Sequence, residues 1–335
     1  MIMRDGPKRP GYPLALIHPL GPLFRHLPLI LRRHLLYLRA FGTWGNFRSP
    51  KRKSEKMQWR IINDHRAIIA FSQDKLAAKE YVRTVLEKHQ LEDHIKIPAT
   101  LWVGRDVREL RALAAQLPAR WVLKPNHSSG RIALLGSTAT PINWDDLIAA
   151  GDRWIQRDEE ELVFGHWAYS QARHLLIAEE WVGGEGEPPL ELKTYMQNGE
   201  IMHYEWVKRA GATTSYACFR ADGTWFRWRA EKDPFYEDPS NRLTLTIEAR
   251  ERLLTLSHAI SSPFDKIRVD VLDDGGALWF SELTPYESAG LYPVSDENDY
   301  FFGARWQLPD LTAPDPREAE WRALLEGTPK GTLQR

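Results

Sequence analysis

The sequence has little cysteine, no net charge and no long apolar run, and each absence excludes a class of protein. Cys218 is the single cysteine among 335 residues, which excludes an internal disulfide framework and a thiolate zinc site and indicates a reducing compartment such as the cytoplasm. Forty-five basic residues match 45 acidic ones, so a dedicated nucleic-acid binder is not expected. No segment approaches the roughly 20 uncharged apolar residues that span a bilayer.

Two common phosphate-binding motifs are also missing. The chain contains neither the GxGxxG fingerprint of dinucleotide-binding folds nor the GxxxxGK[ST] loop of P-loop enzymes. What is present is the composition of a globular protein, with 43% hydrophobic and 27% charged residues and an unusually high count of 14 tryptophans. The chain can therefore bury a large core, and any phosphate site must be built in another way.

The neutral total hides a basic N-terminus. Residues 1–60 hold 13 Lys/Arg and two acidic residues, an excess of 11 positive charges that the remaining residues balance. The segment 1–53 is rich in proline and arginine, and its most apolar part, 13–41, predicts a pair of surface helices that cover the main domain. The alternative is a basic amphipathic face that rests on anionic lipid at the inner membrane face or on a charged partner.

The hydrophobic pattern after residue 53 predicts an α+β fold rather than alternating βαβ units. Helices come first, antiparallel hairpins follow around turns at Asn198–Gly199 and Asp222–Gly223, and a helix and a last hairpin end the pattern. The predicted helices are 74–90, 107–116, 143–156 and 247–260. The predicted strands are 120–124, 174–182, 190–196, 200–207, 216–220, 224–229, 266–272 and 277–283.

The last hairpin carries the first candidate site. Side chains alternate along a strand, so Arg268 and Asp270 share one face, and a connecting loop of odd length would place Glu282 on that face too. Two carboxylates on neighbouring strands supply the hard oxygen ligands that Mg²⁺ takes. The alternative is an exposed face with an ordinary ion pair, worth under ~1 kcal/mol.

Two lysines suggest a phosphate site. Lys124 ends an apolar strand and precedes the small polar loop 126–130, whose backbone N–H groups suit phosphate oxygens. Asp74 is a reasonable N-cap, which leaves Lys75 in the first helical turn, where the helix dipole disfavours a cation unless it faces an anion. Each feature alone also fits an ordinary surface turn.

Taken together, these residues resemble a known family. In order along the chain stand Asp74-Lys75, Val122-Leu123-Lys124, Ala178-Glu179-Glu180-Trp181-Val182, Arg268-Val269-Asp270 and Glu282-Leu283-Thr284. This order resembles the ATP-grasp superfamily of carboxylate ligases. The segment 54–59 and the loop 124–130 are similar to its TupA-like branch, which is associated with teichuronopeptide and other cell-surface glycan genes. The resemblance covers about residues 54 to 293.

The resemblance implies a site for ATP and Mg²⁺. It implies that the two lysines and the loop contact the phosphates, that Glu179 accepts from the adenine amino group, and that one acid of Glu185, Glu187 and Glu191, preferably Glu191, binds the ribose. The implied nucleotide-binding residues are Lys75, Lys124, Asn126, His127, Ser128, Ser129, Gly130, Glu179, Glu180, Trp181, Val182, Glu191 and Lys193. The implied catalytic residues are Lys124 and Arg268, and the implied metal ligands are Asp270, Glu282 and Thr284.

The chain departs from the family pattern at two places. Thr284 stands where many ATP-grasp ligases have asparagine, which puts a second metal ion in doubt. The usual preceding Rossmann-like substrate domain is also missing. The resemblance divides the chain into a basic segment 1–53, an N-terminal ATP-grasp subdomain 54–180, a C-terminal subdomain 181–310 and a tail 311–335.

The implied reaction is the ATP-dependent joining of a carboxylate to an amine, such as a uronic acid to an amino acid, through an acyl phosphate. A kinase that phosphorylates a sugar hydroxyl, and a non-catalytic glycan- or membrane-associated binding protein, are the alternatives. The segments 203–220, with Lys208, Arg209 and Tyr216, and 286–292 are the expected acceptor side.

Overall fold

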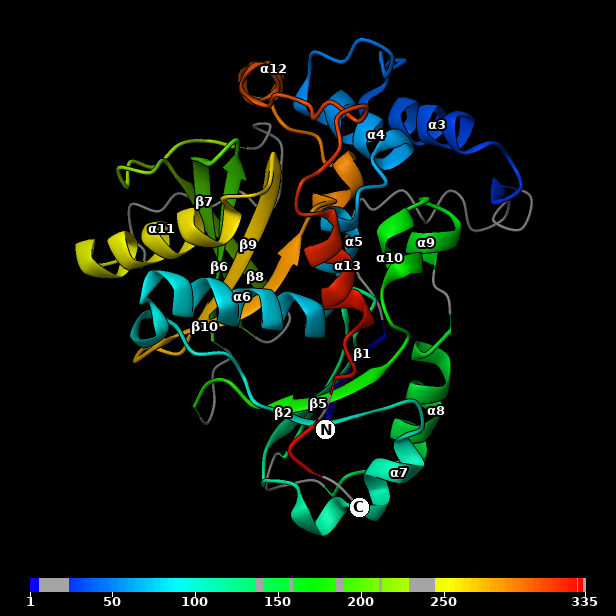
Figure 1. Ribbon diagram of the computed structural model, residues 1–335, viewed down its shortest axis with the longest axis vertical. Helices are drawn as coiled ribbons and strands as arrows, with labels where there is room; N and C mark the ends of the chain where they lie inside the picture. Colours follow the sequence, from blue (N-terminus) through cyan, green and yellow to red (C-terminus); the bar gives the residue numbers. More distant parts are fainter. Residues whose placement is uncertain are drawn as a thin grey trace.

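The computed structural model describes residues 1–5, 24–136, 141–156, 159–184, 189–210, 213–228, 245–329 and 331–333. Helices combine with two five-stranded antiparallel sheets that lie in separate parts of the molecule (Figure 1). This arrangement confirms the predicted α+β class. Across the described ranges, no helix has both the length and the apolar character needed to cross a bilayer.

The first sheet has the strand order β1-β4-β3-β5-β2. Its strands are β1 (Ile2–Asp5), β2 (Thr100–Gly104), β3 (Trp121–Pro125), β4 (Arg131–Leu135) and β5 (Leu176–Glu180). Helices α7 (Val107–Ala112) and α8 (Trp144–Trp154) pack on it and bury a core that includes Trp121, Trp154 and Leu176. Because β3 and β5 are antiparallel, the end of β3, where the polar loop begins, lies beside the start of β5.

The second sheet has the strand order β10-β9-β6-β7-β8. Its strands are β6 (Leu190–Gln197), β7 (Glu200–Ala210), β8 (Thr213–Phe219), β9 (Lys266–Asp273) and β10 (Leu278–Thr284). Alternation along β9 sends Val269 into the core with Leu192 of β6, while Arg268 and Asp270 take the opposite face. One face of this sheet is therefore apolar and the other carries charged side chains.

Helices cover the apolar face of the second sheet. They are α4 (Lys53–Asn63), α5 (Ala67–Gln73), α6 (Lys75–His89), α11 (Ile247–Ser261) and α13 (Glu318–Glu326), which share one core with the sheet. The remaining helices are α3 (Leu29–Phe41), α9 (Glu159–Leu162), α10 (Trp167–Gln171) and α12 (Asp296–Arg305), and short 3₁₀ turns lie at η1 (Glu92–His94), η2 (Ala114–Gln116) and η4 (Glu287–Gly290).

Packing does not follow sequence order. Helices α4 to α6 lie between β1 and β2 of the first sheet in the chain, but they pack against the second sheet, because their apolar residues complete its core. The segment 311–333 is integrated as well: Trp321 of α13 is buried against Phe71 of α5, and the amides of Thr332 and Leu333 donate to carbonyls beside β2. The boundary proposed at residues 180 and 181 coincides with the end of β5, between the two sheets.

Most predicted elements are present, and the exceptions have local reasons. The stretch 224–228 forms no strand; it turns back around Gly223, which has a φ of 87°, and makes a single bridge from Trp225 to Phe219. Arg229 lies outside the described residues, as do 6–23, where the first of the two predicted N-terminal helices would lie; α3 is the second. Strands β1, β2 and β4 were not predicted.

Candidate active site

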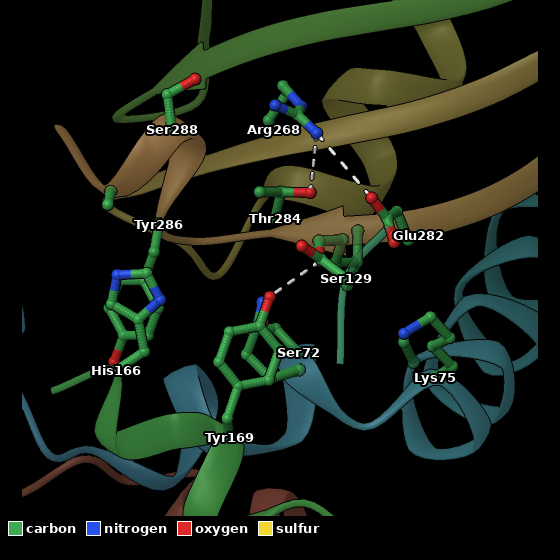
Figure 2. A pocket seen from close by; sticks show the side chains of 14 residues that line it. Ser72, Lys75, Ser129, His166, Tyr169, Arg268, Glu282, Thr284, Tyr286 and Ser288 are labelled. Atoms are coloured by element: carbon green, nitrogen blue, oxygen red, sulfur yellow. Dashed lines mark hydrogen bonds and ion pairs between the residues drawn. The ribbon is translucent and has the colours of Figure 1, made fainter. Parts of the chain in front are cut away.

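A pocket opens between the two sheets, at the start of α6, the start of β9 and the end of β10 (Figure 2). The residues that line it come from strands, helices and turns in distant parts of the chain. The pocket is lined by Ser72, Gln73, Lys75, Ala78, Ser129, His166, Tyr169, Arg268, Glu282, Leu283, Thr284, Tyr286, Ser288 and Ala289. Five of these residues are among those predicted for the site: Lys75, Ser129, Arg268, Glu282 and Thr284.

The charged side chains of β9 and β10 meet at one wall of this pocket. Asp270 pairs with Glu282 across the two strands, and Arg268 pairs with Thr284. The odd-length loop predicted between the strands is wrong, because residues 274–277 form a four-residue connection. A β-bulge between Phe280 and Glu282 shifts the register by one residue and restores Glu282 to the Asp270 face.

Arg268 holds these groups together. Its Nε and Nη2 donate to the two oxygens of Asp270 at 2.6 and 2.5 Å, and Nη2 also donates to Thr284 Oγ1 at 3.1 Å. Figure 2 shows the same guanidinium directed at Glu282, whose Oε1 lies 3.8 Å away. Because Arg268 and Asp270 are buried and Glu282 is partly exposed, the wall presents Glu282 to the pocket.

The electrostatics of this wall favour a cation. Burial raises the pKa of Asp270, and the nearby charge of Glu282 raises it further, against the opposing effect of Arg268. The two carboxylates and the Thr284 hydroxyl are hard oxygen donors, the type that Mg²⁺ prefers alongside water and phosphate oxygens. Within the described ranges, no cluster of three or more His, Cys, Asp or Glu side chains is placed to hold a metal. A magnesium ion here would therefore need ligands from its substrate.

Lys75 lies where the first sheet approaches this wall. Its Nζ donates to the carbonyl of Ser128 at 2.6 Å, which joins the start of α6 to the polar loop after β3. Burial lowers the pKa of Lys75, and the charge of Glu282 partly offsets that effect. Within the loop, Ser129 lines the pocket and Gly130 adopts a left-handed φ of 70°, which only glycine adopts freely.

The first residue of the loop serves the scaffold. The Asn126 amide donates to Asp74 at 2.7 Å and to the carbonyl of Arg173 at 2.9 Å, and its oxygen accepts from the Leu76 amide. Asp74 is the predicted N-cap of α6: it accepts from the Ala77 amide and also pairs with Arg173. The Asn126 side chain therefore fixes the loop to α6, and the nucleotide contact of this residue stays a prediction.

His127 packs beneath the loop. Its ring is buried and stacks on His174 with 3.8 Å between centroids, and it does not line the pocket. Burial, with a smaller contribution from His174, lowers the pKa of His127 to about 3. This imidazole is therefore neutral at physiological pH, and its phosphate contact stays a prediction. Ser128 is buried next to it, and its carbonyl, not its hydroxyl, meets Lys75.

Glu179 forms a buried cluster with two lysines behind the loop. Its oxygens lie 2.6 Å from Lys124 Nζ and 3.1 Å from Lys79 Nζ. Burial disfavours the charged carboxylate, but the two ammonium groups outweigh it and lower the pKa of Glu179 to about 2. The predicted residues Glu179 and Lys124 are thus in contact, and Lys124 is partly exposed. Lys79, whose pKa is lowered to about 8 by burial, was not among the predicted residues.

The segment after β5 lies farther from the pocket. Glu180 accepts from the Ala99 amide at 3.0 Å, Trp181 lies against Arg120, and Val182 is buried. On β6, Glu191 and Lys193 point to the charged face of the second sheet, 3.2 Å apart, and Lys193 pairs with Asp270 across the strands. Of the predicted ribose acids, Glu185 and Glu187 lie outside the described residues.

A comparison with known protein families decides which family the chain belongs to. A model of the TupA-like ATP-grasp family matches residues 55–307. The chain belongs to the TupA-like ATP-grasp family. Because the match covers both sheets from β2 to β10 and the charged wall, the resemblance noted in the motifs and the predicted ATP-grasp fold are confirmed. No match was found among curated protein sequences.

Solved structures give weaker likenesses to this member of the TupA-like family. VanG D-Ala:D-Ser ligase from Enterococcus faecalis is 14% identical with a TM-score of 0.36, over 64% of this chain and 52% of that one. D-alanine–D-alanine ligase from Bacillus anthracis in complex with ATP is 15% identical with a TM-score of 0.34, over 68% of this chain and 64% of that one. L-amino acid ligase from Bacillus licheniformis is 13% identical with a TM-score of 0.36, over 74% of this chain and 46% of that one. The chain thus spans about half to two-thirds of their lengths, and the family assignment rests on the sequence model.

Sequence reasoning missed one side of the pocket. Ser72, His166, Tyr169 and Ser288 line it, and only Ser288 falls within a segment predicted for the acceptor side, 286–292. The other predicted segment, 203–220, forms β7 and β8 at the edge of the second sheet and contributes no lining residue among those described. No local pattern marks His166, because its position depends on how three separate segments pack.

Proposed function

We propose that this protein is an ATP- and Mg²⁺-dependent ligase that joins a carboxylate to an amine. The observation that carries the proposal is the meeting of Lys75, Ser129, Arg268 and Glu282 at one pocket in a chain of the ATP-grasp family. Two cations and an acid at one wall suit a phosphate chain with its metal ion. ATP would supply the phosphoryl group that activates the carboxylate for the amine.

Each residue has a definite part in this proposal. Asp270 and Glu282, with Thr284, would hold Mg²⁺, which would neutralise charge on the phosphates. Arg268 holds both acids in place and directs a positive charge into the pocket, where negative charge is redistributed during transfer. Lys75 would bind a phosphate oxygen. Lys124 is fixed by Glu179 behind the loop and would reach the same phosphates.

The nucleotide would extend from this wall toward the end of β5. We place the adenine beside residues 179–182 and the ribose beside Glu191 and Lys193, which share the charged face of the second sheet. In this proposal the parts of the chain before and after residue 180 act as the two ATP-grasp subdomains. A role in cell-surface glycan synthesis in the cytoplasm, with a uronic acid and an amino acid as substrates, follows the family resemblance.

The experiment measures ADP release by the full chain with ATP and Mg²⁺. A panel of uronic acids and amino acids is tested singly and in pairs, and products are identified by mass spectrometry. A ligase gives ADP release that requires both a carboxylate and an amine, and a product containing the new amide. ADP release with a sugar alone, together with a phosphorylated sugar, would show a kinase instead. The variant Glu282→Gln controls for contaminating ATPases.

Nucleotide binding separates an enzyme from a binding protein. We expect ATP with Mg²⁺ to raise the melting temperature of the full chain, because a ligand that binds only the folded state stabilises it. The absence of any nucleotide-dependent shift at millimolar ATP would contradict the proposed function in every form, including the kinase.

A further inference from the structure

The pocket has two ends of different chemistry. One end carries Lys75, Arg268 and Glu282, and the other is lined by rings and uncharged polar groups (Figure 2). The residues of this second end are Ser72, Gln73, His166, Tyr169, Tyr286, Ser288 and Ala289. No charged side chain lines it among the described residues. A substrate that spans the pocket therefore meets charge at one end and only neutral hydrogen-bonding groups and rings at the other.

His166 is the central polar group of the uncharged end. Its side chain is 2% exposed, and neither ring nitrogen has a hydrogen-bond partner among the described residues. The ring stacks on Tyr286 with 4.9 Å between centroids and lies 5.8 Å from the Tyr169 ring. A buried polar group without a partner costs free energy, so an imidazole kept in this state at a pocket wall points to a ligand that satisfies it.

The imidazole is neutral in this environment. Burial lowers the pKa of His166 well below its ordinary value, and the nearby positive charge of Arg33 lowers it further. A neutral imidazole offers one N–H donor and one acceptor nitrogen, which is the pair of functions that a hydroxyl group matches. An anionic group can use only the N–H of this ring and leaves its acceptor nitrogen unpaired, whereas Arg268 and Lys75 at the other end suit an anion.

Helix α3 fixes the wall around His166. The buried Arg33 donates to the carbonyl of Ala289 at 2.6 Å and to the carbonyl of Phe164 at 3.2 Å, so it joins the η4 turn to the segment that carries His166. Gln58 supports the same turn through the Gly290 carbonyl at 3.0 Å. Ser288 and Ala289 both have left-handed φ values, 49° and 56°, a strained arrangement that persists only where the surroundings enforce it.

We propose that the uncharged end of the pocket, around His166, is the subsite for the hydroxyl-bearing part of the carboxylate substrate. The substrate class is a sugar acid: its carboxylate lies toward Arg268 and Lys75, and its ring hydroxyls hydrogen-bond to His166 and face the tyrosine rings. Aromatic rings beside neutral donors and acceptors suit a ring that has both apolar faces and hydroxyl groups. This proposal rests on the proposed function, because it assigns a binding subsite to the carboxylate substrate of that reaction.

The test compares two ligands of equal charge and ring size. Binding of D-glucuronate and of cyclohexanecarboxylate to the full chain is measured by titration calorimetry, with and without Mg²⁺ and ADP. The variant His166→Phe keeps the ring and removes both nitrogens. His203→Phe is the matched control, because His203 is equally buried, has no partner for either nitrogen among the described residues, and does not line the pocket.

The wild-type chain should bind D-glucuronate at least about tenfold more tightly than cyclohexanecarboxylate, an advantage that one or two hydrogen bonds supply. His166→Phe should lose that advantage, while His203→Phe keeps it and both variants keep the affinity for ADP. In the wild type, D-glucuronate should also shift the imidazole nitrogen resonances of His166, which tests the contact without any substitution that could disturb folding.

Equal affinity for the two ligands, or a His166→Phe variant that binds D-glucuronate as the wild type does, would overturn the subsite. Unchanged resonances of His166 at saturating D-glucuronate would do the same. The ADP titration reports separately on the proposed function. A chain that binds ADP but does not distinguish the two acids retains the ligase proposal without this substrate class, whereas a chain that binds no nucleotide loses the ligase proposal itself.

Discussion

The two ends of the pocket are built in different ways. The charged end depends on residues that regular structure fixes: Arg268 and Asp270 on β9 and Glu282 on β10, which form one hairpin, and Lys75 at the start of α6. The uncharged end depends on turns and short helices that distant segments hold in place, above all Arg33 of α3. The proposed phosphate site therefore has a frame of regular structure, whereas the proposed substrate subsite lies on turns and short helices.

The largest effect is expected at the charged end, from Glu282→Gln or Asp270→Asn. A neutral amide is a poor ligand for Mg²⁺, so ADP release should fall about a thousandfold with no loss of the folded state. Steady-state kinetics and circular dichroism provide the measurement. Asp273→Asn, at the partly exposed far end of β9, is the control and should retain full activity. Near-normal turnover in Glu282→Gln at saturating Mg²⁺ would contradict the metal site.

The buried cluster of Glu179 with Lys124 and Lys79 predicts an acid-dependent loss of stability. The pKa of Glu179 is about 2 in the folded state and 4.5 ordinarily, so its contribution is complete above pH 4.5 and is lost as the pH falls toward 2. Between pH 5 and 3 the wild type should lose about 2 kcal/mol more free energy of unfolding than Glu179→Gln. Parallel denaturant titrations of both proteins measure this, and equal slopes against pH would exclude the ion cluster.

Lys75 offers a sharper test of the phosphate end. Lys75→Met keeps the apolar stem and removes the charge, so ADP release should fall by about 30-fold, and the affinity for ATP should also weaken. Lys88→Met, on the exposed face of the same helix, is the matched control. If both variants show the same kinetics, the contact between Lys75 and the loop carbonyl at Ser128 is structural only.

The sequence predicted the charged end because strand periodicity and helix capping are local rules. Arg268, Asp270 and Lys75 could be placed from their neighbours alone, and Asp74 caps its helix as expected. Glu282 lies on the predicted face, but a β-bulge after Phe280 places it there, not an odd-length loop. The bulge depends on how β10 packs and could not be predicted from the sequence.

The remaining residues required tertiary structure. Asn126 and His127 lie in a recognisable loop, yet both side chains turn inward, since Asp74 and His174 come from distant segments. His166 could not be recognised from the sequence, because it is distinguished by ring nitrogens that have no hydrogen-bond partner among the described residues. Local pattern thus identified the frame of the site, and contacts between distant segments decided which side chains face the pocket.

Arg33 tests whether helix α3 supports only the uncharged end. Arg33→Met removes the hydrogen bonds to the Ala289 and Phe164 carbonyls, so the wall around His166 should loosen and the affinity for D-glucuronate should fall about tenfold. The affinity for ADP should not change, because the hydrogen bonds of Arg33 to Gln58, Phe164 and Ala289 support the uncharged end. Arg39→Met, exposed on the same helix, is the control. An equal loss of affinity for both ligands would mean that the variant disturbs the whole pocket.

The smallest effect is expected from the strand at the N-terminus, β1. Asp5 pairs with Arg153 at 2.8 Å and accepts from the Trp154 indole, which attaches this edge strand to α8, far from the pocket. Both charged side chains are about half exposed, so Asp5→Asn should lower the free energy of unfolding by no more than about 1 kcal/mol. Binding of ADP and of D-glucuronate should be unchanged, in contrast to Arg33→Met. A denaturant titration and the two binding measurements check this, and a loss of either affinity would show that the N-terminal strand also supports the site.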